Sequence, residues 1–242
     1  MLDFRTRNTL LRELMDDPDC DPVRLQRTYR QFGTVNRLVA SWKRIITREL
    51  LLRVAERNGG NRSLTLLDIG CGLLDNAVTV REHAARLGFS LHITGIDPNP
   101  VAASMVLARP LPVDAAFEQC YLHDLALQGK HFDLVISNHL MHHLSDEENL
   151  ALFNDIETVT RGAALMNDLR RSPVSWAAYG LATLPVRWYS FLSIDGMRSI
   201  RRSYTPEELM HLTQRCGTAA GTWQVIPVWP FRQVVRYEPH TV

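Results

Sequence analysis

The sequence of 242 residues lacks any uninterrupted apolar stretch approaching the roughly 20 residues that a membrane-spanning helix requires. Its first residues, Met-Leu-Asp-Phe-Arg, have no signal-peptide pattern. Cysteine is also scarce: the four cysteines lie far apart without metal-ligand spacing, so we expect reduced thiols. These absences predict a cytoplasmic protein with no membrane span.

A strong excess of one charge is absent as well, because 27 lysines and arginines face 26 aspartates and glutamates. The chain is not basic overall and has no repeat of aromatic and basic residues, which argues against nucleic acid as a partner. With 45% hydrophobic residues, it has the composition of a globular protein of one domain with a small appendage. Residues 170–202 hold six arginines and one acid, which fits either a solvated surface or contact with an anionic acceptor or its carrier.

The most informative segment that is present, residues 64–72, joins an apolar strand pattern to an aspartate and two glycines. Glycine lets the backbone turn sharply and approach a ligand that a Cβ would exclude. The helix pattern that follows offers unpaired N–H groups at its start. Asp68 precedes Gly70 and Gly72, and its carboxylate would repel a pyrophosphate. We therefore predict a nucleotide-like ligand that carries an ammonium or sulfonium charge.

A second strand pattern, residues 89–96, ends in Asp97-Pro98. In a βαβ unit the ends of two such strands lie side by side, and an acid there can accept hydrogen bonds from both hydroxyls of a ribose. The sequence therefore predicts Asp97 as a ribose-binding residue.

These motifs together resemble those of the class I S-adenosylmethionine-dependent methyltransferases, specifically the small-molecule branch that includes the ubiquinone and menaquinone methyltransferases. The resemblance covers roughly residues 64–170 and is carried by Leu67-Asp-Ile-Gly-Cys-Gly72, Gly95-Ile-Asp-Pro98, and Phe132-Asp-Leu-Val-Ile-Ser-Asn-His139 with Met141-His-His-Leu144. It implies S-adenosylmethionine as the cofactor and S-adenosylhomocysteine as its product. The cofactor-binding residues that it implies are Asp68, Gly70, Gly72, Asp97, Pro98, Tyr121, Leu122 and Asn138.

Strand and helix patterns alternate through the middle of the chain, which predicts an α/β fold with a parallel sheet covered on both faces. The expected strands are residues 64–69, 89–96, 116–120, 132–137 and 163–168, and the expected helices are 74–87, 99–108, 146–160 and 205–216. Residues 223–228 and 231–236 predict an antiparallel hairpin around Trp229-Pro230. In the resembled fold, this hairpin completes a Rossmann-like, mostly parallel, seven-stranded sheet.

Two segments lie outside this alternation. Residues 22–57 have the apolar period of a long amphipathic helix, with Gly33 as the expected break. We expect residues 1–60 to form a helical lid and residues 61–242 to form the methyltransferase domain. Residues 170–204 are rich in aromatics and poor in strand signals, so we interpret them as a helical insertion over the carboxyl edge of the sheet. Their aromatic side chains fit either an apolar wall around the acceptor or the core of the insertion.

Candidate catalytic groups follow the fourth strand, in Asn138-His-Leu-Met-His-His143. A neutral histidine, with an unperturbed pKa of about 6.5, suits proton removal from a phenol. The resemblance matches His143 to a histidine of the family, so His143 and His142 are the predicted catalytic bases, with a core hydrogen bond as the alternative. The predicted substrate contacts are His139, Asp168 and Arg171, of which Asp168 suits a turn cap equally well.

Metal binding is the other interpretation of three clustered histidines. His139 and His143 are four residues apart, but Leu140 stands where a zincin has glutamate. We therefore predict no metal site.

One departure from the family pattern concerns the glycine turn, because Leu74 replaces the third glycine. Either the loop shifts to admit the donor, or cofactor binding is weakened. We predict O-methylation of a small aromatic or polyketide-like acceptor, with C-methylation of a quinone-like ring as the alternative. A non-catalytic binding protein of the same fold is the alternative that Leu74 favours, and a nicotinamide-dependent oxidoreductase is opposed by Asp68. A homodimer is compatible with the sequence.

Overall fold

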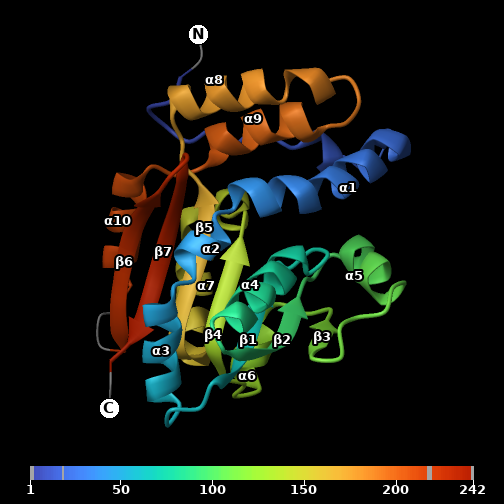
Figure 1. The fold of residues 1–242 in the computed structure, drawn as a ribbon. Coiled ribbons are helices and arrows are strands. Elements are labelled where there is room, and N and C mark those ends of the chain that lie inside the picture. Colours follow the sequence, from blue (N-terminus) through green and yellow to red (C-terminus); the bar gives the residue numbers. More distant parts are fainter. Residues whose placement is uncertain (1–2, 18, 217–219, 241–242) are drawn as a thin grey trace.

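The computed structural model describes residues 3–17, 19–216 and 220–240, and the side chains of Asp16, Tyr29 and residues 32–39 lie outside this description. At its centre is a seven-stranded sheet in the order β3-β2-β1-β4-β5-β7-β6 (Figure 1). The strands are β1 (Ser63–Ile69), β2 (Ser90–Ile96), β3 (Ala115–Glu118), β4 (Phe132–Asn138), β5 (Thr160–Leu169), β6 (Gly221–Val228) and β7 (Arg232–Pro239).

Strands β1 to β5 pair in parallel, whereas β7 pairs antiparallel with both β5 and β6. The predicted mostly parallel, seven-stranded sheet with a C-terminal antiparallel hairpin is therefore confirmed. Every residue of β4, the middle strand, is buried, as expected for a parallel strand with helices on both faces.

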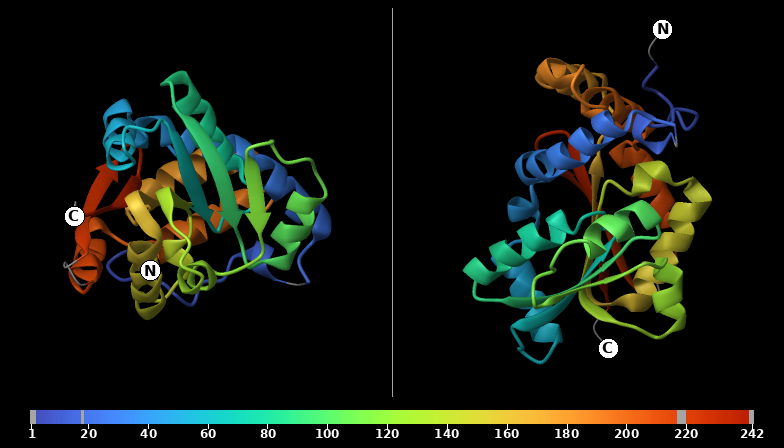
Figure 2. Two further views of the ribbon diagram at one scale, coloured as in Figure 1. Left: turned by 90° about the horizontal axis from the view of Figure 1, so that it is seen from below. Right: turned by 90° about the vertical axis from the view of Figure 1, so that its right-hand side faces the viewer.

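Helices cover both faces of the sheet (Figure 2). One face packs against α3 (Arg48–Arg57), α4 (Asp75–Arg86) and α5 (Pro100–Leu107), which share a core with alternate residues of β1, β2 and β4. The other face packs against α6 (Leu122–Leu127), α7 (Asp146–Val159) and α10 (Pro206–Gln214), which form a second core. The sheet thus separates two apolar cores and leaves its carboxyl edge for polar residues.

The N-terminal helices differ from the prediction of a break at Gly33. Helix α1 (Pro22–Val39) continues through Gly33, and the chain breaks instead at Ser41, whose φ of 56° is left-handed. A short α2 (Trp42–Ile45) follows, and the hydroxyl of Thr47 caps α3 by accepting from the Leu50 amide. A glycine inside a helix costs only about 1 kcal/mol, whereas a left-handed residue ends the helical hydrogen-bond ladder.

Residues 170–204 form a helical pair, α8 (Pro173–Ala182) and α9 (Leu192–Arg202), with a 3₁₀ turn at Leu184–Val186 between them. The pair lies over the carboxyl ends of the strands (Figure 1). The segment before α1 is largely extended, with a 3₁₀ turn at Leu14–Asp16, and runs beside α9. None of the described helices is both long enough and apolar enough to cross a membrane.

Candidate functional site

A cavity of about 300 Å³ lies at the carboxyl edge of the sheet. Strand β1 lies there between β2 and β4, and the order of the strands along the chain reverses at this point of the sheet. Open α/β sheets bind their ligands at such a reversal. We call one part of the lining the glycine side; it consists of Gly70, Gly72 and Asp97. The other part, the histidine side, consists of Glu13, His142, His143 and Asp195.

The glycine turn has the backbone that the sequence predicts. Gly70 and Gly72 have φ angles of 63° and 50°, which favour glycine, and a Cβ at Gly72 would meet no atom within 4 Å. Open space therefore adjoins the turn. Leu74 also has a left-handed φ, of 62°, but its side chain is 1% exposed and packs in the core against Gly95 and Cys71. Leu74 does not line the cavity, so its side chain leaves the space beside the glycine turn open.

Asp97 lies at the cavity wall, as predicted. One carboxylate oxygen accepts from the Gly72 amide at 2.9 Å, and the other accepts from the Asn99 amide at 2.9 Å. A carboxylate has about four acceptor positions, so hydrogen-bonding capacity remains for ribose hydroxyls. Asp97 also fixes the shape of the glycine turn, a second role that the sequence does not reveal.

Asp68 is placed differently from the prediction. It is 1% exposed, lies behind the glycine turn and is not part of the cavity lining. Among the described residues no donor forms a well-aligned hydrogen bond with either of its carboxylate oxygens, although the Ala77 amide lies near them. Burial raises the pKa of Asp68 to about 8, the neighbouring carboxylates of Asp97 and Asp75 add to this effect, and the Ala77 amide opposes it. Asp68 is therefore mostly protonated at neutral pH and does not act as an open anion at the mouth of the turn.

Three further predicted cofactor residues lie outside the lining. Tyr121 precedes α6 with its side chain 67% exposed, and Leu122 is buried in the second core. Pro98 is exposed beside the turn that starts α5.

The wall between the two sides is built on Arg232, which the sequence analysis did not single out. Arg232 is 1% exposed, and its guanidinium donates to Asn138 Oδ1 at 2.7 Å, Asn167 Oδ1 at 3.1 Å and His139 Nε2 at 2.8 Å. All three partners are neutral acceptors, since burial and Arg232 hold the pKa of His139 well below its usual value. The cavity wall thus contains a buried cation that forms no ion pair among the described residues.

His139 has a left-handed φ of 61°, a strained conformation for a residue with a side chain. Its amide donates to the Asn167 carbonyl at 3.0 Å, and its ring accepts from Arg232. The structure therefore brings the predicted residues Asn138 and His139 into the cavity wall, where the bonds to Arg232 fix their orientation.

His142 sits between two carboxylates. Its Nδ1 lies 2.7 Å from Asp168, which also accepts from the His142 amide at 3.0 Å, and its Nε2 lies 3.7 Å from Glu13 Oε1. His142 and Asp168 are both 2% exposed. Although burial opposes it, the two carboxylates raise the pKa of His142 to about 9, while the imidazolium holds the pKa of Asp168 well below its usual range. With this raised pKa, His142 is mostly protonated near neutral pH, in which form it donates rather than accepts a proton.

His143 lies beside His142 with its Nε2 3.8 Å from Glu13 Oε1. Burial and the neighbouring imidazolium lower the pKa of His143 to about 4, so its ring is neutral. A base with so low a pKa is weak, because proton transfer is most efficient when the catalytic pKa lies near the working pH. His143 therefore lines the cavity as a neutral imidazole that is a weak base.

Glu13 is the residue that the sequence analysis missed most clearly. It is 7% exposed and accepts a hydrogen bond from the Ser199 hydroxyl of α9. The adjacent Leu14 and Met15 amides donate to the carboxylate of Asp195 at 2.7 and 3.1 Å. Burial, with the charge of Glu13, raises the pKa of Asp195 to about 6. No local sequence pattern could have placed an N-terminal glutamate beside the histidines.

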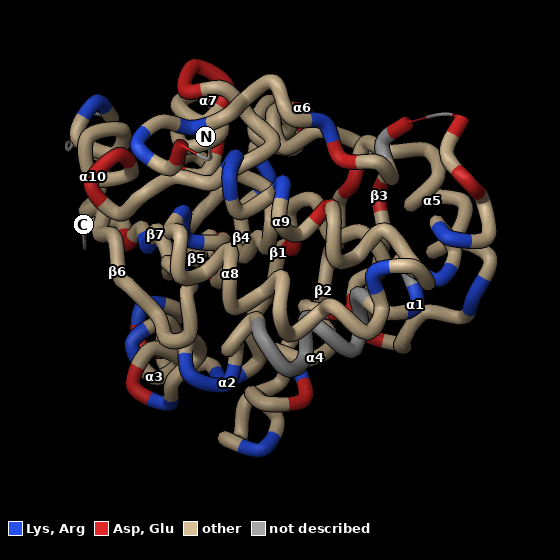
Figure 3. Tube along the Cα trace, turned by 90° about the horizontal axis from the view of Figure 1, so that it is seen from above, with Lys and Arg blue, Asp and Glu red and all other residues tan. Residues whose placement is uncertain are grey.

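Arg171 was predicted to contact substrate, but it lies away from the cavity. It is 3% exposed and donates to both oxygens of Glu208, at 2.5 and 2.9 Å, and to the carbonyls of Phe4, Arg5 and Ser203. Its role is to hold the N-terminal segment and α10 together. Seen from above this edge, basic and acidic segments are interspersed rather than gathered into one basic surface (Figure 3).

The aromatic residues of the α8–α9 segment differ in position, because one lines the cavity and others are exposed. Tyr179 lines the cavity and donates to the Leu192 carbonyl at 2.9 Å. Trp188 and Tyr189 point outward, with 85% and 51% of their surfaces exposed. Only Tyr179 therefore fits the predicted apolar wall.

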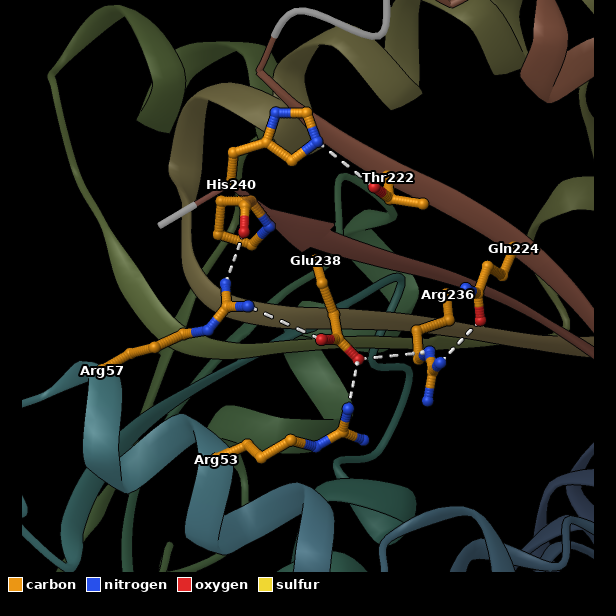
Figure 4. Close-up of a pocket in the computed structure, with 8 residues that line it drawn as sticks. Arg53, Arg57, Thr222, Gln224, Arg236, Glu238 and His240 are labelled. Carbon is orange, nitrogen blue, oxygen red and sulfur yellow. Dashed lines mark hydrogen bonds and ion pairs between the residues drawn. The ribbon is translucent and has the colours of Figure 1, made fainter. Parts of the chain in front are cut away.

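A second cavity, of about 330 Å³, lies at the opposite edge, between α3 and the β6–β7 hairpin (Figure 4). Three arginines there surround Glu238: Arg53 and Arg236 lie 3.5 and 3.3 Å from Oε1, and Arg57 lies 3.6 Å from Oε2. These ion pairs join α3 to the end of β7. The cavity contains none of the predicted site residues, so the cavity at the carboxyl edge is the candidate site.

Comparison with known proteins agrees with this geometry. Residues 66–162 match the family model described as a methyltransferase domain. A ubiquinone biosynthesis O-methyltransferase of Cereibacter sphaeroides is 27% identical over 158 residues, which are 64% of this chain and 60% of that protein. The chain thus matches about 60% of the length of this curated relative.

Solved structures show the same fold. The plantazolicin methyltransferase BpumL in complex with SAH aligns over 94% of this chain and 93% of its own, with a TM-score of 0.65 and 14% identity. The mitomycin 7-O-methyltransferase MmcR aligns over 94% of this chain and 59% of its own, with a TM-score of 0.55 and 14% identity.

The strand order, the glycine turn with Asp97 at the next strand end, and these matches are those of a class I S-adenosylmethionine-dependent methyltransferase domain, which the family model places at residues 66–162. The resemblance drawn from the motifs is confirmed. Within this class, the curated sequence that the chain matches is an O-methyltransferase.

Proposed function

We propose that this chain transfers a methyl group from S-adenosylmethionine to an oxygen atom of a small aromatic or polyketide-like acceptor. The observation that carries the proposal is that one cavity joins the glycine side to the histidine side. A donor on the first and an acceptor on the second would share one enclosure, as in-line displacement requires. The matched O-methyltransferase sequence supports oxygen over carbon as the target atom.

The residues of the glycine side fit the donor. Gly70 and Gly72 leave open space beside the backbone, and Asp97 retains acceptor capacity for ribose hydroxyls. Asn138 and the unpaired cation of Arg232 lie in the adjoining wall, where a guanidinium suits the carboxylate of the donor. When bound, S-adenosylmethionine supplies a methyl group whose bond to sulfur breaks as a bond to the acceptor oxygen forms, leaving S-adenosylhomocysteine and a proton.

The histidine side favours a neutral acceptor with hydroxyl groups. Its carboxylates, Glu13 and Asp195, would repel an anion but accept hydrogen bonds from hydroxyls. Tyr179 and Leu192 add apolar surface for a ring. This composition argues against the anionic or carrier-bound acceptor that the arginine-rich stretch left open.

We further propose that residues 1–60 act as a lid on the domain formed by residues 61–242. In support, Glu13 and Met15 line the cavity, and α1 contacts both α4 and α9. The non-catalytic alternative loses its basis, because Leu74 points into the core and not into the cavity.

Two measurements test this function. Calorimetry should detect binding of S-adenosylhomocysteine in preference to NADH, since residues 66–162 match a methyltransferase domain. Mass spectrometry should then detect transfer of an isotopically labelled methyl group to at least one member of a panel of phenols and hydroxylated polyketides. Absence of S-adenosylhomocysteine binding at millimolar concentration would contradict the proposal, and a product labelled on carbon would redirect it to C-methylation.

A further inference from the structure

We propose that Glu13, His142 and His143 form a binding site for a divalent transition-metal ion such as Zn²⁺. The site requires only the described side chains, so it stands or falls independently of methyl transfer. It differs from the motif that the sequence analysis rejected, because it uses His142 and His143 in place of His139 and His143, and its carboxylate ligand, Glu13, comes from the N-terminal segment.

The donor atoms have suitable spacing. Glu13 Oε1 lies 3.7 Å from His142 Nε2 and 3.8 Å from His143 Nε2, and the three ligand atoms all lie within 4.8 Å of one another. These separations are too long for hydrogen bonds. Two atoms that each lie about 2.1 Å from a tetrahedral zinc are about 3.4 Å apart, so small side-chain movements would close the set. Two imidazoles and one carboxylate also form a common catalytic zinc set that leaves a position open.

The surrounding residues orient these ligands. Asp168 holds Nδ1 of His142 at 2.7 Å, which directs Nε2 toward Glu13. A carboxylate in this position is the usual outer partner of a metal-binding histidine. The Ser199 hydroxyl donates to Glu13 Oε1, and Asp195 fixes the next two amides of the N-terminal segment. The carboxylate of Glu13 is therefore held in place from two directions.

The charge balance also favours a cation. Glu13, Asp168 and Asp195 are three acidic side chains around the site, each at most 7% exposed. Two guanidinium groups also approach it, but they donate to backbone carbonyls: Arg202 to that of His143 at 3.3 Å and Arg7 to that of His142 at 3.4 Å.

A neighbouring group, His139, His142 and Asp168, is a poorer candidate although its ligand atoms are equally close. His139 Nε2 already accepts from the buried Arg232 at 2.8 Å, and Asp168 is engaged by His142 Nδ1. A guanidinium at that distance would repel a metal ion, so the cation belongs on the Glu13 side of His142.

An ion at this site would have a clear chemical use, on the assumption that the proposed methyl transfer is correct. A bound divalent cation lowers the pKa of an oxygen ligand directly. The acceptor hydroxyl would then bind at the open position as the oxyanion, with its proton released to bulk water.

The test is zinc binding to the whole chain, measured by calorimetry and by metal content after equilibrium dialysis. Replacement of zinc by Co²⁺ adds a visible absorption band that reports the ligand set. The variants are Glu13→Gln, which keeps the shape but removes the charge, His143→Ala, and Asp168→Asn. The matched control is His123→Ala, because His123 also pairs with a carboxylate, Asp155, at 3.1 Å but lies outside the cavity.

We expect one zinc ion per chain, with affinity reduced by about tenfold or more in the three site variants and unchanged in His123→Ala. Circular dichroism and binding of S-adenosylhomocysteine identify variants that remain folded, and this donor readout is separate from the metal readout. Zinc content well below one ion per folded chain would overturn the site. Equal zinc affinity in Glu13→Gln, His143→Ala and the parent chain would overturn it as well.

Discussion

The side chain of Leu74 occupies the space that a Cβ on Gly95 would fill. Leu74 ends the glycine turn and Gly95 lies in β2, so a bulky residue at one position is matched by the absence of a side chain at the other. Cys71 Sγ also lies close to this space, 2.8 Å from the ideal Cβ position of Gly95. The exchange of a family glycine for leucine is therefore accommodated within the core.

This pair predicts a thermodynamic coupling. Leu74→Ala should lower the free energy of unfolding by about 2–5 kcal/mol, the usual cost of a buried leucine, and leave the affinity for S-adenosylhomocysteine within about twofold. Gly95→Ala should also destabilise the protein, because its methyl group would collide with Leu74. The double variant should be more stable than the sum of the two changes implies. Denaturant unfolding of all four proteins checks this, and strict additivity would contradict it.

Asp97 is predicted to be the strongest single determinant of donor affinity. Asp97→Ala should weaken binding of S-adenosylhomocysteine by about tenfold, because it removes the acceptor for ribose hydroxyls and releases the Gly72 amide. The control is Asp114→Ala, an exposed acid just before β3. Calorimetry of both variants provides the comparison, and an equal loss in each would show that the effect is one of general charge.

Asp68 predicts a pH dependence of stability. Its folded pKa of about 8 lies above the ordinary aspartate pKa of 3.8, so the folded chain holds a proton that the unfolded chain loses. The free energy of unfolding should therefore fall as pH rises from about 4 to about 8, and then level off with respect to this group. In Asp68→Asn this contribution disappears. Denaturant unfolding across that range tests it: the parent should lose stability relative to the variant as pH rises, and parallel curves would contradict the assignment.

Arg171 is predicted to affect stability rather than acceptor binding. Arg171→Met should lower the free energy of unfolding by roughly 3 kcal/mol, since the carbonyls of Phe4 and Ser203 lose their donor while Glu208 can still reach solvent. Arg170→Met, at an exposed neighbouring position, is the matched control and should have little effect. Thermal unfolding, with donor affinity measured in parallel, distinguishes this role from one in steering an anionic acceptor.

The parts of the fold that the sequence predicted are those set by local patterns. Strand and helix alternation, the Gly70–Gly72 turn and Asp97 at a strand end all follow from periodicity and turn chemistry over short distances. Gly33 was misleading because a helix tolerates glycine when tertiary contacts support it.

The parts of the site that the sequence did not predict depend on distant contacts. Glu13 joins His142 across most of the chain, and Arg232 reaches His139 from β7. The sequence predicted Arg171 as a substrate contact and His142 as a catalytic base, yet their partners, Glu208 and the two carboxylates, decide what each one does. Sequence spacing identifies such residues but contains no information on which charge lies opposite them.

The hydrogen bonds from Leu14 and Met15 to Asp195 mean that the two sides of the cavity are built by separate parts of the chain. The glycine side is embedded in the strand core, whereas the histidine side needs the opening segment clasped onto α9. Under the proposed assignment of donor and acceptor, exchanging that segment together with α9 changes only the acceptor side, so the junction between the N-terminal segment and α9 is the place to engineer specificity.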